Sequence, residues 1–244
     1  MIGKVGVDEA GRGGQAWPLH FLSLGSKEEF QVARPKSALT AVAGQAGKST
    51  REMLLDIAGE LLAEVGIERI STNMICRRAG VTPPALYHYF ADKYAVLEAL
   101  GVRLMDRQNE VLIAWLERHG GQGIEAYADH LEELLHETTR VTWAEPGGTW
   151  IERALHATPS LTHVRVQSHE YVTDRLTDAF APLLPELTRQ ELWLRMRVGV
   201  EFGYGVNEMA SEASDSERAA IFAEAARIQR VALLDTRLAR PAAG

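Results

Sequence analysis

The chain has 244 residues, of which 46% are hydrophobic and 24% charged, a balance typical of water-soluble globular proteins. No apolar run approaches the ~20 residues that cross a bilayer, and the first residues show no secretory pattern. Cys76 is the only cysteine, so an internal disulfide is excluded. These features predict a cytoplasmic protein without a membrane span.

The net charge of −7 is unevenly distributed along the chain. Residues 1–47 hold five Lys/Arg and four Asp/Glu, residues 48–93 hold six of each, and residues 94–244 hold 15 basic and 23 acidic side chains. The acidity therefore lies in the C-terminal part. A neutral segment can still present its bases on one face, so charge alone gives only weak support for nucleic-acid binding.

Residues 1–47 are rich in Gly, Ala and Ser and lack a sustained hydrophobic period. This composition predicts a disordered N-terminal arm. Two alternatives stay open: Lys27, Arg34 and Lys36 could contact a DNA backbone, or translation could start further downstream.

A first helix is predicted from about Lys48, capped by Ser49 or Thr50, to Gly66, which ends it. Apolar residues recur along it at spacings that place them on one face. This stripe comprises Met53, Leu54, Ile57, Ala58, Leu61, Leu62 and Val65.

Residues 71–93 predict two short helices joined by a tight turn, followed by the start of another helix. Ser71 is a good cap for the first of the two, and Gly80 supplies the left-handed residue of the turn. Thr82 is expected to cap the second, and Pro83 suits its first turn because a missing N–H is no loss there. A helix-turn-helix of this kind can place its second helix in the major groove of DNA.

Asp92 is expected to cap a long helix that runs to about His119. Further helices are predicted over residues 124–139, 149–157, 160–180, 188–211 and 215–238, and no strand alternation is present. The predicted fold class is therefore all-α, with about nine helices. The predicted domains are a disordered arm (1–47), a helix-turn-helix DNA-binding head (48–94) and a helical effector-binding and dimerisation domain (95–244).

The predicted head offers a set of side chains to DNA. The N-terminus of its third helix would favour phosphate through free N–H groups, while Tyr87, His88 and Lys93 could reach phosphates or base edges. Prolines and alanine at the start of this helix offer compact apolar surface to thymine methyl groups. The candidate DNA-binding residues are Thr72, Asn73, Thr82, Pro83, Pro84, Ala85, Tyr87, His88 and Lys93.

Each of these assignments has a structural alternative. Tyr87 could pack against the first helix, and His88 could be a solvated surface residue. Arg77 and Arg78 are better explained as solvated surface than as phosphate contacts. Cys76 is better explained as a small buried apolar residue than as a redox switch.

The head resembles the tetracycline-repressor (TetR) family of transcriptional regulators. The resemblance is carried by Ile57-Ala58, Gly66, Ser71, Ala79-Gly80-Val81, and Leu86-Tyr87-His88-Tyr89-Phe90 followed by Asp92-Lys93. It covers roughly residues 50–100; beyond them only the order and lengths of the helices agree. The chain departs from the family at Asn73, where a basic residue is common, and at Pro83, where a polar one is common.

The resemblance implies a repressor that binds a double-stranded DNA operator and releases it when a small-molecule effector binds; no cofactor is expected. Bulky amphipathic residues in the middle helices are candidates for the effector pocket, although each could equally belong to the core of a helix bundle. The candidates are Tyr127, His130, Trp143, Trp150 and Tyr171, with the two tryptophans first.

The two C-terminal helices are expected to form a homodimer interface, because each carries a stripe of small and apolar residues. Packing within one chain is the alternative. The stripes are Leu192, Met196, Gly199, Val200, Gly203 and Val206, and Ala219, Phe222, Ala223, Ala226, Val231 and Leu234.

Other classes of protein remain as alternatives. Glu133-Leu-Leu-His136 has the Glu-x-x-His spacing of di-iron bundles, but the required second copy is missing. A regulatory metal site built from His130, His163 and His169 stays open. No nucleophile elbow or phosphate-binding loop is present, so an enzyme is not expected. A helical protein-binding adaptor would not need Tyr87, His88 and Lys93 on one exposed face.

Overall fold

The computed structural model describes residues 49–235, so the predicted N-terminal arm lies outside the described residues. Within that range the chain forms ten α-helices and one 3-10 turn, and no strand. The helices are α1 (Thr50–Arg69), α2 (Thr72–Ala79), α3 (Pro83–Tyr87), α4 (Lys93–His119), α5 (Ile124–Asp129), α6 (Leu131–Ala144), α7 (Gly148–Ala157), α8 (Thr162–Phe180), α9 (Arg189–Ser211) and α10 (Asp215–Leu234), with the turn at Pro159–Leu161. The all-α prediction is confirmed.

One predicted helix is divided in two. The segment expected as a single helix over residues 124–139 forms α5 and α6, which meet at His130. The amide of His130 donates to the carbonyl of Tyr127 at 3.2 Å, and its carbonyl accepts a hydrogen bond from Trp115 Nε1 at 3.0 Å. The side chain of Trp115 on α4 is thus hydrogen-bonded to the backbone at the break between α5 and α6.

The first two helices follow the predicted caps closely. Ser49 and Ser71 accept hydrogen bonds from the amides of Glu52 and Met74, each at 3.3 Å, and start α1 and α2. Gly66 has φ 74° and interrupts α1, and Gly80 has φ 66° in the turn after α2. Both angles lie in the left-handed region that glycine tolerates best.

Helix α3 has five residues and is not capped by a side chain. Thr82 occupies the N-cap position but makes no cap hydrogen bond. The amides of Tyr89 and Phe90 both donate to the carbonyl of Leu86, at 2.9 and 3.0 Å, and this turn ends the helix at Tyr87. The short helix is held by packing, because Leu86 and Phe90 are buried in the aliphatic core formed with α1 and α2.

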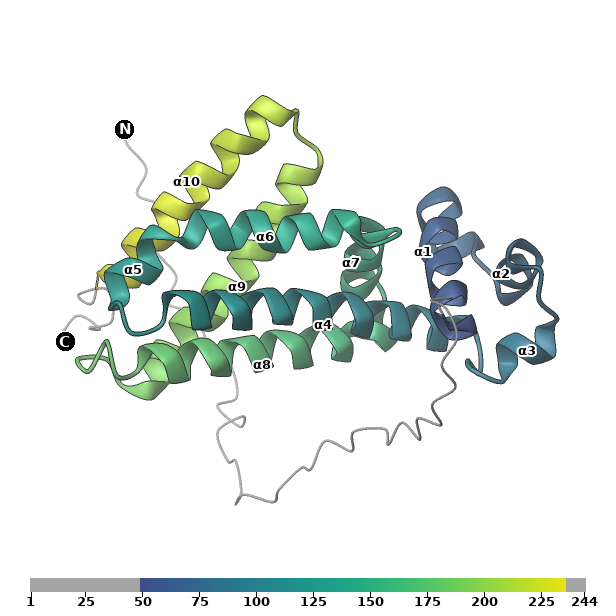
Figure 1. The fold of residues 1–244 in the computed structure, drawn as a ribbon, viewed down its shortest axis with the longest axis horizontal. Helices are drawn as coiled ribbons and strands as arrows, with labels where there is room; N and C mark the ends of the chain where they lie inside the picture. Colours follow the sequence, from purple (N-terminus) through teal and green to yellow (C-terminus); the bar gives the residue numbers. More distant parts are fainter. Residues whose placement is uncertain (1–48, 236–244) are drawn as a thin grey trace, which may run out of the picture. The chain divides into compact units, whose positions relative to one another are not determined.

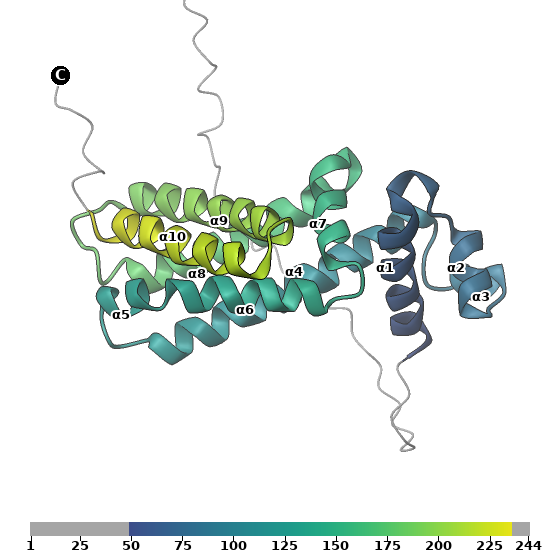
Figure 2. The same ribbon diagram turned by 90° about the horizontal axis from the view of Figure 1, so that it is seen from above.

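Helix α1 is covered on two sides. Its predicted stripe lies in the core that it shares with α2, but Leu55 and Gly59, which lie outside that stripe, are also buried. They are covered because α1 also packs against α7 and the loop before it, as Figures 1 and 2 show. A stripe read from one helical period could not reveal this second contact.

The remaining helices are arranged around α4, which runs from the first three helices into the C-terminal part (Figure 1). Helices α8 and α6 lie along two sides of α4. Helix α9 packs against α8, and α10 packs against α6 and α9. No described helix is long and apolar enough to cross a bilayer.

The predicted dimer stripe on α9 faces inward. Leu192, Met196 and Val206 are buried within this chain, so for this stripe the alternative of packing within one chain is correct. The predicted α10 stripe is divided, since Phe222 is buried whereas Val231 is exposed. The reason is that α9 packs against both α8 and α10 within the chain, so its stripe faces the interior.

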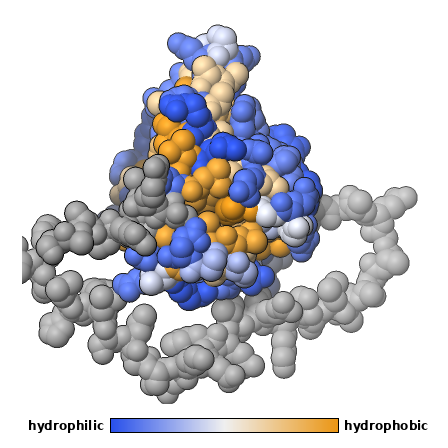
Figure 3. Space-filling model, turned by 90° about the vertical axis from the view of Figure 1, so that its left-hand side faces the viewer, coloured by the Kyte–Doolittle hydropathy of each residue, from blue (hydrophilic) through white to orange (hydrophobic). Residues whose placement is uncertain are grey.

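Val231 and four apolar residues outside the predicted stripes remain exposed on these helices. Leu194, Val198 and Met209 on α9 are 59%, 62% and 53% exposed, and Ile228 and Val231 on α10 are 44% and 52% exposed. Figure 3 also shows a hydrophobic patch at the end of the molecule where α5 and the C-terminal end of α10 lie. The C-terminal helices therefore leave apolar surface that no other part of residues 49–235 covers.

Candidate nucleic-acid interface and effector cavity

The surface formed by α2 and α3 carries no negative charge. Residues 70–91 contain no aspartate or glutamate, whereas the acids of the head lie mainly on α1. Arg78 is held by Glu64 of α1 through two hydrogen bonds of 2.6 and 2.7 Å, while Arg77 is exposed. A surface without acids does not repel a phosphate backbone, even in a chain whose net charge is negative.

Tyr87 and Thr72 lie together on this surface. The Tyr87 side chain is 50% exposed, and its hydroxyl lies 3.3 Å from Thr72 Oγ1, so the end of α3 meets the start of α2. His88 and Tyr89 are exposed beside them, with ring centroids 4.9 Å apart. The structure therefore excludes packing of Tyr87 beneath α1 and presents its hydroxyl at the surface.

The start of α3 differs from the sequence-based expectation. Asn73, Thr82, Pro83 and Pro84 are exposed and Ala85 is partly buried. The expected free N–H groups are absent at this end, because two of the first residues are prolines and the amides of Ala85 and Leu86 donate to the carbonyl of Thr82. Any phosphate contact here must come from side chains.

Lys93 ties the head to the start of α4. Its Nζ donates to the carbonyl of Ile67 at 3.2 Å and lies 5.3 Å from the centre of the Tyr94 ring. The side chain remains partly exposed. An ammonium group has three donors, so one such bond leaves it able to contact a phosphate as well.

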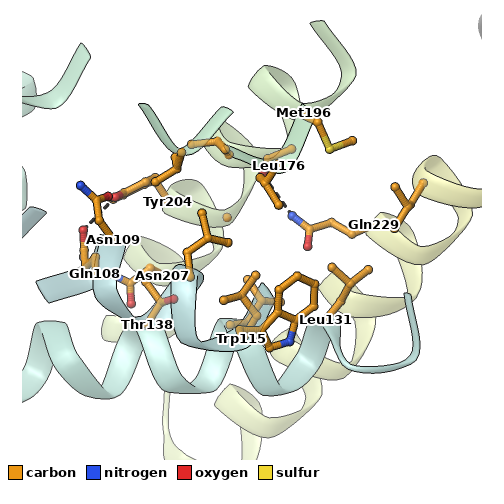
Figure 4. Close-up of a pocket in the computed structure, with 18 of the residues that line it drawn as sticks. Gln108, Asn109, Trp115, Leu131, Thr138, Leu176, Met196, Tyr204, Asn207 and Gln229 are labelled. Atoms are coloured by element: carbon orange, nitrogen blue, oxygen red, sulfur yellow. Dashed lines mark hydrogen bonds between the residues drawn. The ribbon is translucent and has the colours of Figure 1, made fainter. Parts of the chain in front are cut away.

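A cavity of about 170 Å³ lies between the helices of the C-terminal part. It is lined by residues of α4, α6, α7, α8, α9 and α10. Figure 4 shows Trp115, Leu131, Leu176 and Met196 toward one end, with Gln229 near them. Gln108, Asn109, Thr138, Tyr204 and Asn207 gather at the other end. The cavity is therefore mostly apolar, with one polar end, as small-molecule sites in proteins commonly are.

The polar end is built around the buried carboxyl group of Glu152 on α7. Gln108 Nε2 and Asn207 Nδ2 each donate to it at 2.7 Å, and Thr142 Oγ1 donates at 3.3 Å. Tyr204 completes the network by donating from its hydroxyl to Gln108 Oε1 at 2.7 Å. Burial raises the pKa of Glu152 to about 7, although these three donors oppose the shift.

Asn207 leaves one buried atom of this network without a partner. Its Oδ1 accepts no hydrogen bond, while its amide nitrogen is bound to Glu152. Rotation of the amide by half a turn would let Oδ1 accept a hydrogen bond from the O–H of a neutral Glu152 carboxyl group. The end of the cavity can thus present either a carboxylate or a carboxylic acid at neutral pH.

A buried ion-pair cluster joins the head to the wall of this cavity. Glu145, in the loop between α6 and α7, pairs with Arg103 and Arg107 of α4. Arg103 also reaches Glu52 and Asp56 of α1, at 2.8 and 3.0 Å. One arginine therefore connects the helix that begins the head with the loop that precedes Glu152.

The same loop touches α1 directly at Gly59. A Cβ atom at this position would overlap the carbonyl group of Pro146, so only glycine permits the observed approach. Helix α7, which carries Glu152, starts two residues after Pro146. A shift of α7 at the polar end of the cavity would therefore be transmitted to α1 through the backbone contact between Pro146 and Gly59.

None of the five sequence-based effector candidates lines the cavity. Tyr127 is buried behind its wall, where it packs on Trp115 and Phe180 with ring centroids 5.2 and 4.9 Å apart. His130 lies at the α5–α6 break, stacked on His119, and Tyr171 is 46% exposed on α8.

The two tryptophan candidates lie elsewhere. Trp143 and Trp150 line a separate polar hollow, where Arg218 and Arg153 lie over their rings. The two tryptophans expected to lie in the effector pocket are therefore not in the walls of the cavity.

One pattern in the sequence does point to the cavity. Gly199, Gly203 and Asn207 follow one another at four-residue spacing on α9, and all three line it. Small residues on the buried face of a helix leave room that a bundle core would otherwise fill. This stripe predicted close packing with a second chain, whereas it borders the space inside one chain.

Comparison with known proteins agrees with this organisation. The family described as "Bacterial regulatory proteins, tetR family" matches residues 54–100, that is, α1 from Leu54 to the first part of α4. The class D tetracycline repressor of Escherichia coli is 37% identical over 60 residues, which are 25% of this chain and only 28% of that repressor.

Two further relatives extend the similarity over most of the chain. The HTH-type transcriptional regulator UidR of Escherichia coli K12 is 26% identical over 173 residues, covering 68% of this chain and 86% of UidR. The crystal structure of a TetR-family regulator from Streptomyces coelicolor superposes with a TM-score of 0.55 at 23% identity, over 75% of this chain and 97% of that one, and shares its fold. The helix-turn-helix head thus matches the tetR family of bacterial regulatory proteins, and the chain with its helical C-terminal part has the fold of TetR-family regulators.

Proposed function

We propose that this protein is a DNA-binding transcriptional regulator that reads its operator with the acid-free surface of α2 and α3. The observation that carries the proposal is the pairing of the exposed Tyr87 hydroxyl with Thr72 on that surface. Thr72, Tyr87 and Lys93 contact phosphates, while Asn73, Pro83, Pro84, Ala85 and His88 lie where base edges pass, with Thr82 between the two groups.

Recognition requires two heads, because one short helix reads few base pairs. We infer that the chain acts as a homodimer, in which the exposed residues Leu194, Val198 and Met209 of α9 pack against a second copy together with α10. Two-fold symmetry then places the heads on two half-sites of an inverted repeat.

The cavity is the proposed effector site. Its lining favours a small molecule with an apolar body and one polar group directed at Glu152, Asn207 and Tyr204. A ligand group that accepts a hydrogen bond would favour neutral Glu152, and a cationic group would favour the carboxylate.

Effector binding would reach the DNA through α7. A ligand that contacts Glu152 shifts α7 and its preceding loop, which hold α1 through the Pro146–Gly59 contact and the Glu145–Arg103 pair. If the effector binds more tightly to the state in which the two heads are wrongly spaced for the operator, the protein releases the operator when the effector binds. The protein then acts as a repressor.

The test is selection of DNA by the purified full-length chain from a random duplex library at low salt. The expected result is enrichment of an inverted repeat, which Tyr87→Ala binds about tenfold more weakly, equivalent to about 1.4 kcal/mol. Tyr171→Ala removes a similarly exposed tyrosine from α8 and is the matched control, with unchanged affinity expected. Failure to enrich any sequence, or equal binding by Tyr87→Ala and the unsubstituted chain, would contradict the proposal.

A further inference from the structure

Three side chains that can bind a metal ion converge where α4 ends and α5 gives way to α6. They are His119, His130 and Glu133, and one donor atom from each lies within 4.8 Å of the other two. They do not line the cavity. Neither of the metal arrangements considered from the sequence is formed, since His136 packs on the Phe222 ring, His163 pairs with Glu98 and His169 pairs with Glu201.

His130 has its free nitrogen defined by a backbone contact. Its Nδ1 lies 2.7 Å from the carbonyl oxygen of Ala126, and because a carbonyl can only accept, Nδ1 carries the proton. Nε2 therefore holds the lone pair. A histidine that donates one nitrogen to a backbone carbonyl while the other ligates is a common arrangement at metal sites.

His119 supplies a buried donor atom without a partner. Its side chain is 7% exposed, and its Nε2 makes no hydrogen bond, although it lies 3.3 Å from Glu133 Oε2. A buried polar atom left unpaired is costly, so the site lacks a partner that a ligand could provide. A metal ion between His119 and Glu133 would supply it.

Glu133 is held in place by its other oxygen. Arg118 donates to Glu133 Oε1 and also to Glu137 Oε1, at 3.2 Å in the second case. The two glutamates and the arginine together carry a net negative charge, which favours a cation. Oε2 is directed toward His119 and remains available.

We propose that His119, His130 and Glu133 bind one divalent transition-metal ion of the zinc class. Two imidazole nitrogens and one carboxylate oxygen are a ligand set that zinc accepts, and three protein ligands leave a fourth position for water or another molecule. Tetrahedral coordination places the donors about 3.4 Å apart, so the donor atoms, now within 4.8 Å of one another, approach by up to about 1.4 Å. The stacked rings of His119 and His130, with centroids 3.9 Å apart, turn out of their stack as it closes.

The bound ion would also brace the wall of the cavity. The Trp115 ring lies edge-on to His119, with centroids 5.6 Å apart, and its Nε1 donates to the carbonyl of His130. Trp115 lines the cavity on its other side. Metal binding therefore fixes His130 at the α5–α6 break and Glu133 in the first turn of α6 against His119 at the end of α4.

The experiment uses the full-length chain, stripped of metal by chelation and carrying no histidine tag. Zn²⁺ is titrated by calorimetry, and Co²⁺ by its visible absorption, which reports nitrogen and oxygen ligands directly. We expect one ion per chain and a rise in melting temperature with Zn²⁺ concentration. Glu133→Gln and His130→Gln are expected to weaken binding by at least about tenfold.

His136→Gln is the matched control, because it removes an exposed histidine from the same helix as Glu133. It should bind Zn²⁺ as tightly as the unsubstituted chain. Unchanged affinity in both Glu133→Gln and His130→Gln, or no saturable Zn²⁺ binding at all, would overturn the proposal. Glu133 is partly exposed, so its substitution tests the site without disturbing the core. DNA is absent from the measurement, and the result is therefore independent of the proposed regulatory function.

Discussion

The head and the C-terminal part of this chain have cores of opposite character. Within described residues 49–93, the buried side chains are aliphatic, apart from Cys76 and Phe90. All the buried polar side chains of the described residues, including Glu152 and His169, lie between residues 108 and 207. A dry core specifies one rigid surface for DNA, whereas buried polar groups around a cavity can change state when a ligand or a proton arrives.

The contact between these two regions gives the largest expected effect. Gly59→Ala places a methyl group against the carbonyl of Pro146, a backbone atom that cannot turn aside. We expect the free energy of unfolding to fall by about 3 kcal/mol, as in severe overpacking. Chemical denaturation of purified protein measures the change.

The control for Gly59→Ala is a second helical glycine with open space around it. Gly199→Ala meets no atom within 4 Å, and alanine is a better helix former, so stability should rise by up to about 1 kcal/mol. If both variants shift stability equally, the Gly59 contact is not what holds the head to the loop before α7.

The second expected effect is a pH dependence that arises from two buried groups of the C-terminal part. Glu152 has a pKa of about 7 in the folded chain and 4.5 ordinarily, so between these values the unfolded chain binds fewer protons and stability falls as pH rises. His169 acts oppositely: burial lowers its pKa from 6.5 to about 4, so its contribution to stability is lost as pH falls through that range. The two contributions oppose each other between pH 4.5 and 6.5.

Glu152→Gln should remove the contribution of Glu152 to the pH dependence of stability and leave that of His169. A shift of this size corresponds to about 3 kcal/mol, so the variant should gain up to that amount over the unsubstituted chain as pH rises from 4.5 to 8. His169→Gln should show the reverse, losing its pH dependence between 4 and 6.5. Melting temperatures recorded across this pH range decide the matter, and parallel curves for all three proteins would refute the assignment.

The third effect concerns the exposed face of α9. Val198→Asp introduces a charge at a side chain that is 62% exposed in one chain and would be buried in a dimer. We expect dimerisation to weaken by about 2 kcal/mol, or roughly 30-fold. Val102→Asp, at an exposed valine of α4, is the control, and light scattering distinguishes the two. A dimer unaffected by Val198→Asp would place the interface elsewhere.

The same contrast explains what the sequence could and could not predict. The head depends on short-range chemistry: Ser49, Ser71 and Asp92 cap helices and Gly80 ends α2, as expected from residue type and spacing. Gly66, expected to end the first helix, interrupts α1, which continues to Arg69. Leu55 and the second contact of α1 were missed, because they depend on a loop some ninety residues further along the chain.

The C-terminal part depends on long-range contacts that a helical period does not encode. The four-residue spacing of Gly199 and Gly203 on α9 is compatible with a partner chain or with a cavity. Only the packing of the other helices decides between the two. Similarly, the break at His130 follows from Trp115, a residue on another helix. Large aromatics such as Tyr127 and Trp143 therefore do not mark the cavity.

The smallest expected effect tests the surface of the head. Lys93→Ala should lower DNA affinity for every sequence by about 1 kcal/mol and reduce the slope of log affinity against log salt by about 1, as for a single phosphate contact. Arg227→Ala, which removes an exposed cation from α10, should leave the slope unchanged. Lys93 also binds the carbonyl of Ile67, so melting curves must accompany the binding curves. A loss of affinity confined to one operator position, with the salt slope intact, would identify Lys93 as a base contact instead.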